Sequence, residues 1–592
     1  MQLCYSGFVT FGVKLFLMMK KCLLLAAMLT GTTRMSFAQQ ASYIDLLSAQ
    51  NQWVDSVFHT LNRKHKVSQL FFVRAHTNKG KAYADSVAKV IKKEQPGGLV
   101  FFQGGPARQA DLTNQYQKIT KIPLLIAMDG EWGLGMRLDS TISYPYQMTL
   151  GAIQDDKLLN QMGREVAYDF KRIGAHMNFA PVVDVNNNPN NPVINYRSFG
   201  DDKYKVALRA IAYMQGMQQG GLLTTAKHFP GHGDTNVDSH YDLPLLNFSR
   251  TRLDTLEEYP FKQAIAAGIS GVMIAHMSIP ALDATKNLPS SLSRPIVTGI
   301  LKDSLGFKGL VVSDAMEMKG VVKYFPEGEA DLRAFMAGND IIELSENSCR
   351  AIKKIKVAIR KGQITEAELD VKVKKVLAAK YFVGLQHYKP ADLQNINQDL
   401  NRTDAKNLVQ QLSDAAVTLL QDNGLLQRMN FLQRTALVSI GTTAPTVYQQ
   451  ELANTYTNNT LFNLDKGASA TEVNKLLSDL RGYSQIIVGV HDTRLRPGSK
   501  LDFNADVKNC IIQLAGNPNA AISVFANPYT LAGMPGIERS GALLACYQKE
   551  DSMQRAASKV MTRQLNPAGK LPVTVNSFFV NGAGVVYSSQ AL

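Results

Sequence analysis

Eight short apolar runs recur between residues 67 and 344, and segments with the spacing of amphipathic helices separate them. The runs span residues 67–73, 98–102, 123–128, 176–183, 222–226, 271–275, 309–312 and 340–344, and the helical segments include 155–173, 203–219 and 256–267. Eight strand–helix repeats favour an α/β fold of the (β/α)8 TIM-barrel type. An open doubly wound sheet competes with it, but the chain has no glycine-rich phosphate fingerprint.

Polar residues follow most of these runs within one or two positions. They are Asp129, Asp184, the pair Lys227-His228, His276 and Asp314. Because the carboxyl ends of parallel barrel strands meet at one face, we expect these side chains to surround a common site.

A barrel domain over residues 42–390 is predicted to precede a second, smaller α/β domain. An amphipathic helix over 42–62 leads into the barrel, and two helices over 350–385, with a capping box at Thr365 and Glu368, end it. A linker at 391–410 then leads to an α/β sandwich at 411–592, with strands at 435–440, 485–490, 521–525 and 542–547. In the sandwich, only His491-Asp492 follows a strand as a candidate catalytic pair.

Residues 1–38 have the pattern of a secretory signal peptide. Lys20 and Lys21 precede an apolar stretch at 22–29, and Ser36-Phe37-Ala38 resembles a cleavage site. We therefore expect an exported, periplasmic or extracellular protein without an integral membrane span after cleavage. An uncleaved anchor is the alternative, although the apolar stretch is short for a span.

The formal net charge of the 592-residue chain is +15; residues 1–38 contribute +4, and the remaining excess is spread along the chain. Such an excess either favours an anionic polymer such as peptidoglycan or is generic surface charge. No nucleic-acid recognition motif accompanies it, so no nucleic-acid partner is expected. Beyond the signal, Cys349, Cys510 and Cys546 are too few for a disulfide framework and are expected to be buried thiols, with a Cys510–Cys546 bridge as a weaker possibility.

The densest group of titratable residues is Lys-His-Phe-Pro-Gly-His-Gly-Asp-Thr at 227–235, followed by Asp-Ser-His at 238–240. Pro230, Gly231 and Gly233 exclude a helix here, so a loop is predicted to start at Lys227. The whole string resembles the signature of glycoside hydrolase family 3, in its β-N-acetylglucosaminidase branch. The resemblance covers residues from about 65 to about 390 and more weakly the remainder.

The resemblance implies that Asp314, in a Ser-Asp-x-x-x-Met context, is the catalytic nucleophile. The same position also suits a helix N-cap. Glu317 is three residues further on and is expected on the next helix.

The resemblance also implies that His240 is the acid/base and that Asp238 polarises it. An imidazole titrates near neutral pH, and a carboxylate partner fixes its tautomer. His232, the rival, is expected to shape the loop. The His228–His232 spacing could indicate a metal pair, but Pro-Gly between them disfavours it, so neither a metal nor a cofactor is predicted.

The matching positions for substrate binding are Asp129, Arg137, Arg197, Lys227 and His228. Charged donors and acceptors make the directional hydrogen bonds that sugar hydroxyls need. Surface ion pairs are the alternative role for the arginines. His276 is expected to line the pocket without a catalytic role.

The resemblance implies a retaining exo-β-N-acetylglucosaminidase that removes terminal β-linked N-acetylglucosamine from peptidoglycan fragments or chitin oligosaccharides. Three alternatives remain open. One is a generic β-glucosidase, although that branch usually takes its acid/base carboxylate from outside this loop motif. A β-N-acetylglucosaminide phosphorylase would use phosphate in place of water, and a non-catalytic cell-wall protein would only bind the sugar.

Overall fold

A computed structural model of the protein describes residues 42–239 and 241–587. The predicted signal peptide therefore lies outside the described residues. Within the described ranges, no helix has both the length and the apolar character needed to cross a bilayer.

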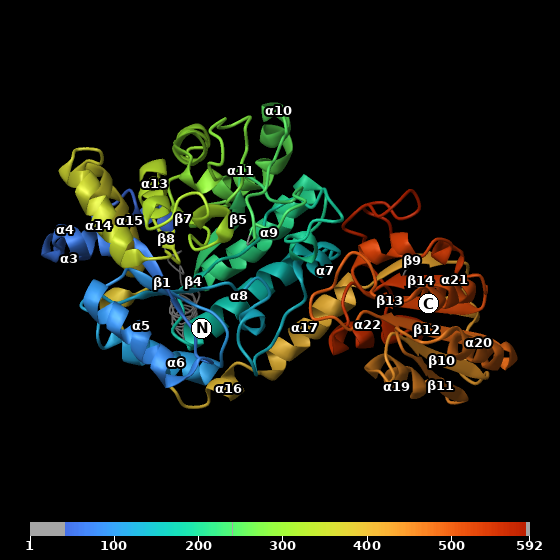
Figure 1. Cartoon of the computed structure of the whole chain (residues 1–592). Helices are drawn as coiled ribbons and strands as arrows, with labels where there is room; N and C mark the ends of the chain where they lie inside the picture. Colours follow the sequence, from blue (N-terminus) through green and yellow to red (C-terminus); the bar gives the residue numbers. More distant parts are fainter. Residues whose placement is uncertain (1–41, 240, 588–592) are drawn as a thin grey trace, which may run out of the picture. The chain divides into compact units, whose positions relative to one another are not determined.

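The first sheet is a ring of eight parallel strands (Figure 1). The strands are β1 (Phe71–Ala75), β2 (Gly98–Phe101), β3 (Leu125–Met128), β4 (Met177–Asn178), β5 (Leu223–Phe229), β6 (Gly271–Ile274), β7 (Leu310–Ser313) and β8 (Ile342–Glu343). They are hydrogen-bonded in sequence from β1 to β7, and β8 lies beside β1. A bridge joins Val312 of β7 to Ile341, the residue directly before β8, and completes the ring. The predicted (β/α)8 barrel is confirmed.

Alternate residues of each strand pack into different parts of the core. Val100 of β2 belongs to the cluster inside the barrel, whereas Leu99 and Phe101 pack towards the surrounding helices. All three side chains are fully buried. Because both faces are covered, the strands have continuous apolar sequences rather than alternating ones.

Helices α5 (Gly80–Glu94), α6 (Pro106–Gln117), α8 (Asp156–Arg172), α9 (Lys203–Gln219), α11 (Tyr259–Ala266) and α13 (Glu329–Ala337) surround the ring (Figure 1). Asp155 caps α8 by accepting a hydrogen bond from the Lys157 amide. Helices α8 and α9 touch where a Cβ at Gly163 would lie 2.4 Å from the Tyr213 carbonyl oxygen. A larger residue there would force the helices apart.

The start of the fold differs from the prediction. The expected first strand at 67–73 begins instead as helix α4 (Arg63–Ser68), capped by Asn62, and β1 starts only at Phe71. The single helix expected over 42–62 is two helices, α2 (Tyr43–Leu46) and α3 (Gln52–Thr60). Asn51 caps α3 and interrupts the apolar pattern that suggested one helix.

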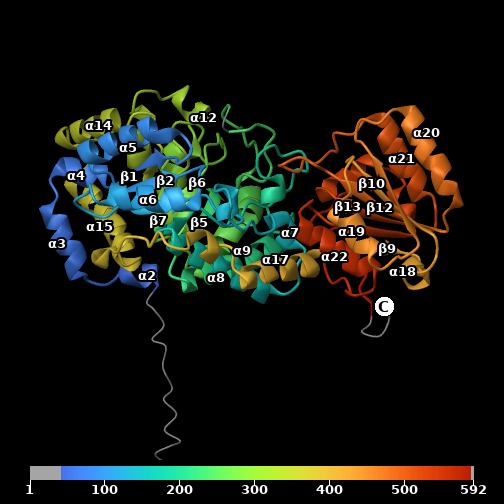
Figure 2. The ribbon, with the colours of Figure 1, turned by 90° about the horizontal axis from the view of Figure 1, so that it is seen from below.

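The second sheet is open and has six strands in the order β11-β10-β12-β13-β14-β9. They are β9 (Thr418–Asp422), β10 (Thr435–Ile440), β11 (Asn459–Leu464), β12 (Gln485–His491), β13 (Ala520–Phe525) and β14 (Ala542–Ala545). All pairs are parallel except β14 with β9. Helices α20 (Ala470–Asp479) and α21 (Ala505–Ala515) lie on one face and α19 (Val447–Ala453) and α22 (Asp551–Met561) on the other (Figure 2). The predicted α/β sandwich is confirmed, although β9 and β11 were not predicted.

Helices α14 (Ser348–Arg360) and α15 (Glu366–Phe382) end the barrel region, and the Thr365–Glu368 capping box of α15 is confirmed. The predicted linker at 391–410 is not an irregular segment. It contains α16 (Ile396–Asp399) and the first half of α17 (Thr403–Ala416), which packs against both α8 and α22. The domain boundaries themselves stay predictions.

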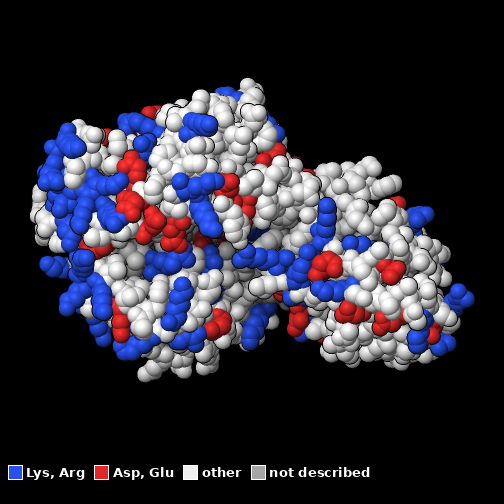
Figure 3. Space-filling view, viewed as in Figure 1, with Lys and Arg blue, Asp and Glu red and all other residues white. Residues whose placement is uncertain are grey.

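Positive charge is spread along the sequence but gathered in space. Figure 3 shows Lys and Arg side chains concentrated over α14 and its neighbours at one edge of the barrel. The described cysteines Cys349, Cys510 and Cys546 are all free thiols, so the weaker idea of a Cys510–Cys546 bridge is wrong. Cys510 and Cys546 are buried, whereas Cys349 is only half-buried.

Candidate active site

The carboxyl ends of all eight barrel strands surround one cavity of about 820 Å³. Each strand or the segment that follows it contributes to the lining: Arg74, Phe102, Asp129, Asn191, Lys227, Met273, Asp314 and Glu343. This volume is in the range of small-molecule sites, and the position is where TIM barrels carry their active sites.

Strand β5 extends further than the sequence predicted. The strand expected at 222–226 continues through Lys227 and His228 to Phe229, so the loop starts only at Pro230. The Lys227 amide and carbonyl bond to Pro181 and Val183, which fixes this end of the strand. Gly231 then turns the chain with φ of 132°, a conformation that favours glycine.

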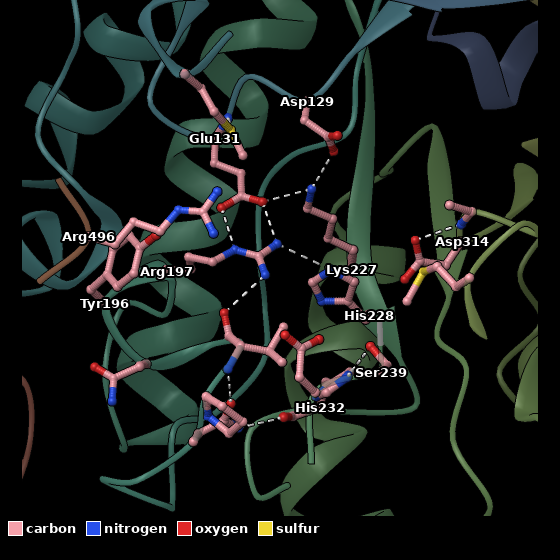
Figure 4. A pocket seen from close by; sticks show the side chains of 18 of the residues that line it. Asp129, Glu131, Tyr196, Arg197, Lys227, His228, His232, Ser239, Asp314 and Arg496 are labelled. Carbon is pink, nitrogen blue, oxygen red and sulfur yellow. Dashed lines mark hydrogen bonds and ion pairs between the residues drawn. The ribbon is translucent and has the colours of Figure 1, made fainter. Parts of the chain in front are cut away.

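Lys227 joins two carboxylates that enter the cavity from the segment after β3. Its ammonium group lies 2.8 Å from Asp129 and 2.8 Å from Glu131, and its side chain is only 2% exposed (Figure 4). Burial opposes the charge, but attraction by Asp129 and then Glu131 outweighs it and raises the pKa of Lys227. The lysine therefore remains a cation that orders both carboxylates.

Two arginines complete this group of charges. Arg137 lies 2.6 Å from Asp129, and Arg197 binds Glu131 through two nitrogens at 2.6 and 2.9 Å. Burial would raise the pKa of Glu131, yet Arg197 and Lys227 hold that pKa down at about 2. The sequence predicted Asp129, Arg137, Arg197 and Lys227 as site residues, and the structure brings all four together. Glu131 was missed, although its place two residues after Asp129 was a usable signal.

Asp184 orders the start of the loop. One of its oxygens lies 2.7 Å from His228 Nδ1, and the other accepts the amides of His228 and His232 at 3.1 and 2.7 Å. Arg197 donates to His228 Nε2 at 3.4 Å. Because a guanidinium only donates, Nε2 accepts and the proton of neutral His228 sits on Nδ1, facing Asp184. His228 is thus fixed in both orientation and tautomer.

His232 lies inside the loop and holds it together. It is 1% exposed, and its two ring nitrogens bond to Thr235 Oγ1 at 3.0 Å and Ser239 Oγ at 3.2 Å. Burial, reinforced by repulsion from His228, lowers the pKa of His232 to about 4. These contacts fit the predicted loop-shaping role.

The predicted acid/base pair is only partly described. Asp238 is half-buried, and it lines the cavity together with Ser239. His240 lies outside the described residues, so its role stays a prediction.

Asp314 directly follows β7 and faces the cavity from the side opposite Glu131 and Arg197 (Figure 4). Its Oδ1 accepts the Ala315 amide at 2.7 Å. Glu317 is not on the next helix as expected. It lies in the turn before α12 (Lys319–Val322), lines the cavity and pairs with Arg74 of β1.

Glu343, the last residue of β8, is a further carboxyl group in the lining that sequence reasoning missed. It is 3% exposed, and its Oε2 has no hydrogen-bond partner among the described residues. Burial first, and then repulsion by Asp129 and Asp314, raises the pKa of Glu343 well above its ordinary value. Burial and the neighbouring carboxylates thus disfavour the ionised form of Glu343.

Other sequence candidates lie elsewhere. His276 is buried behind the lining, 2.7 Å from Ser291 Oγ and 3.1 Å from the Ala315 carbonyl, so the expectation that it lines the pocket is wrong. His491 stacks on Phe525 at 4.6 Å in the second domain, and Asp492 pairs with Arg494. Among the described residues, no group of three or more His, Cys, Asp or Glu is arranged to hold a metal.

Comparison with known families assigns the barrel. Residues 62–379 match the model of the glycosyl hydrolase family 3 N terminal domain. The chain belongs to glycoside hydrolase family 3. The site residues Lys227, His228, Asp238 and Asp314 all lie within the matched range.

Two curated relatives of the chain carry β-hexosaminidase names. The chain is 31% identical over 372 residues to "Beta-hexosaminidase A" of Pseudoalteromonas piscicida, covering 57% of this chain and 62% of the relative. It is 32% identical over 256 residues to a "Beta-hexosaminidase" of Nitrosomonas eutropha, covering 42% and 72%. The chain thus spans about three fifths of the Pseudoalteromonas relative.

A solved family 3 β-N-acetylglucosaminidase from Paenibacillus sp. str. FPU-7 matches both domains. Its TM-score is 0.73 at 30% identity, and the match covers 87% of this chain and 99% of that one. A β-glucoside phosphorylase gives a TM-score of 0.75 over 90% of this chain at 22% identity. At that identity, the second likeness shows the fold alone.

Proposed function

We propose that the protein is a β-N-acetylhexosaminidase that releases terminal β-linked N-acetylglucosamine from glycans. The observation that carries the proposal is the arrangement of one cavity. Asp314 faces it from β7, and a group of charged donors and acceptors on β3, β4 and β5 faces it from the other side. The names of the family 3 relatives support the choice of sugar.

In the proposed reaction, Asp314 attacks the anomeric carbon and forms a covalent glycosyl-enzyme. The bond to the leaving oxygen breaks as His240, acting as an imidazolium, donates its proton to that oxygen. Water then adds to the anomeric carbon, its proton passes to His240, and the Asp314 ester bond breaks. Two inversions leave the product with retained configuration.

The described residues support these steps by binding and orientation. Asp129, Glu131, Arg197, Lys227 and His228 are held in fixed geometry by their ion pairs and hydrogen bonds. A preorganised set of this kind can bind sugar hydroxyls without first rearranging. The Ser239–His232 hydrogen bond holds the loop next to the predicted dyad.

Peptidoglycan fragments are the proposed natural substrate, with chitin oligosaccharides as the other member of the same class. Surface Lys and Arg support an anionic polymer. The test is mass spectrometry of products from muropeptides and from chitobiose, with and without inorganic phosphate. We expect free N-acetylglucosamine in both conditions. Its 1-phosphate, formed only with phosphate, would identify a phosphorylase, and no product from either glycan would contradict the proposal.

The proposal includes export of the protein with cleavage near Gln39, based on the N-terminal sequence pattern. N-terminal sequencing of the protein from its native host checks this. An intact Met1 or Met18 terminus on cytoplasmic protein would contradict export.

A further inference from the structure

A loop of the second domain forms part of the barrel cavity. Residues 492–500, here called the arginine loop, follow β12 of the open sheet. Four of them, Arg496, Pro497, Gly498 and Ser499, line the cavity together with Trp132 and Tyr196 of the barrel. The wall near β3 and β4 is therefore built from both domains.

Ion pairing and hydrogen bonds hold the arginine loop at both ends. Arg494 binds the buried Asp492 carboxylate through two nitrogens, at 2.8 and 2.6 Å, and donates to the Lys500 carbonyl at 2.7 Å. Lys549 donates to the Thr493 carbonyl at 2.9 Å. The loop thus has a defined course across the cavity.

A barrel tyrosine ties the middle of the loop to the barrel. The Tyr146 hydroxyl donates to the Leu495 carbonyl at 3.1 Å. Its ring packs edge-on against Trp132 at 4.8 Å and Tyr196 at 5.0 Å. The Tyr146 amide also donates to Gln548 of the second domain at 3.0 Å. Leu495 directly precedes Arg496, so this contact sets where the Arg496 side chain starts.

Arg496 and the nucleophile candidate Asp314 lie on opposite sides of the cavity. Figure 4 shows its guanidinium pointing inward beside Tyr196, Arg197 and Glu131, with Asp314 on the other side. If Asp314 reaches the anomeric carbon, the opposite edge of the pyranose ring faces Arg496. That edge carries the hydroxyls of the non-reducing end.

The charge of Arg496 is available to a ligand. Arg137, Arg197 and Lys227 of the same wall each pair with Asp129 or Glu131. Arg496 forms no ion pair with any residue in the described ranges. A guanidinium has five N–H donors and no acceptor, which suits the oxygen atoms of a sugar.

We propose that Arg496 is a specificity-determining residue that binds the hydroxyl oxygens at the non-reducing end of the terminal sugar, so that the second domain closes that end of the site. The inference rests on the proposed function for the orientation of the sugar. The proposed ligand of Arg496 is therefore a terminal N-acetylhexosamine whose hydroxyls at the non-reducing end are unsubstituted.

The test compares Arg496→Ala and Arg496→Lys with wild type on 4-nitrophenyl N-acetyl-β-glucosaminide. Loss of charged hydrogen bonds should raise KM about 10- to 100-fold, and Arg496→Lys should recover part of the loss. Arg434→Ala is the matched control, because Arg434 is a surface arginine of the same domain that stacks on Tyr483 outside the cavity. A KM for Arg496→Ala within twofold of wild type would overturn the proposal.

A double-mutant cycle with Tyr146→Phe tests the anchoring. Removing the hydroxyl should raise KM in the wild-type background and have no further effect in Arg496→Ala. An equal effect in both backgrounds would overturn the link between the two residues. The proposed function is tested separately, by whether the wild type cleaves the N-acetyl-β-glucosaminide. If wild type cleaves only a β-glucoside, the same variant ratios are measured with that substrate.

Discussion

In the barrel, the residues that follow β3, β5 and β7 face one cavity, whereas the residues at the end of β12, His491 and Asp492, are buried against Phe525 and Arg494. Both sheets are largely parallel and covered by helices. The ring, however, brings all its carboxyl ends round one opening, and the open sheet spreads its ends along an edge. Similar strand-end patterns in sequence therefore have different outcomes. Among the residues that the structure describes, those of the second domain that line the cavity all belong to its arginine loop.

The largest effect is expected at β7. Asp314→Asn should lower kcat/KM about 10⁴-fold or more while the thermal unfolding curve stays close to wild type, because an amide is a poor nucleophile of nearly the same shape. A 2-fluoro or 5-fluoro glycosyl label should map by peptide sequencing to Asp314. Labelling at Glu317 or Asp238 would show that another carboxylate attacks.

The second-largest loss of activity is expected at His240, and it should distinguish His240 from His232 in the same loop. His240→Ala should slow hydrolysis of a natural disaccharide about 10²–10⁴-fold and slow glycosylation by a nitrophenyl substrate much less, because a good leaving group departs without protonation. A pre-steady-state burst and partial rescue by azide should accompany it. His232→Ala should show neither feature. The reverse pattern would exchange the roles assigned to the two residues.

Glu131→Gln tests whether the buried ion pairs of Glu131 stabilise the fold and support substrate binding. It leaves Arg197 without its carboxylate partner and Lys227 with Asp129 alone, which should destabilise the fold by about 3–5 kcal/mol and raise KM. In wild type, the low pKa of Glu131 gives stability that is present above the ordinary pKa of 4.5 and is lost as pH falls towards about 2. Melting temperatures measured against pH should show a weaker acid loss in the variant. An unchanged melting curve would show that the pairs contribute little.

The smallest effect on activity is expected in the open sheet. His491→Phe keeps an aromatic ring against Phe525 and should leave kcat/KM within about twofold, because the side chain does not line the cavity. Burial lowers the pKa of His491 to about 3, so the unfolded chain binds a proton that the folded chain does not. Wild type should thus lose stability between pH 6.5 and 3, and the variant less. A large loss of activity would show that the strand end of β12 in the open sheet also contributes to the reaction.

Most of the fold could be predicted from local patterns. Apolar runs located the eight barrel strands, and helix α9 was predicted with its observed bounds. The errors came where local signals competed. Asn62 caps helix α4, which extends into the first two residues of the first predicted strand. Strand β5 continues through Lys227 and His228 because Pro181 and Val183 bond to its backbone. Strand β11 was missed because half of its residues are polar, as its place at the edge of the sheet allows.

The sequence by itself determined the order of strands and helices, the strand ends that carry charge, and the motif that points to Asp314 and His240, because spacing and capping are properties of neighbouring residues. Only the tertiary structure decided which charges meet. Lys227 and Asp129 are 98 positions apart, and the Tyr146 hydroxyl and the Leu495 carbonyl are 349 positions apart. Closure of the ring and packing of the second domain against it produce these contacts, and no short stretch of sequence encodes them.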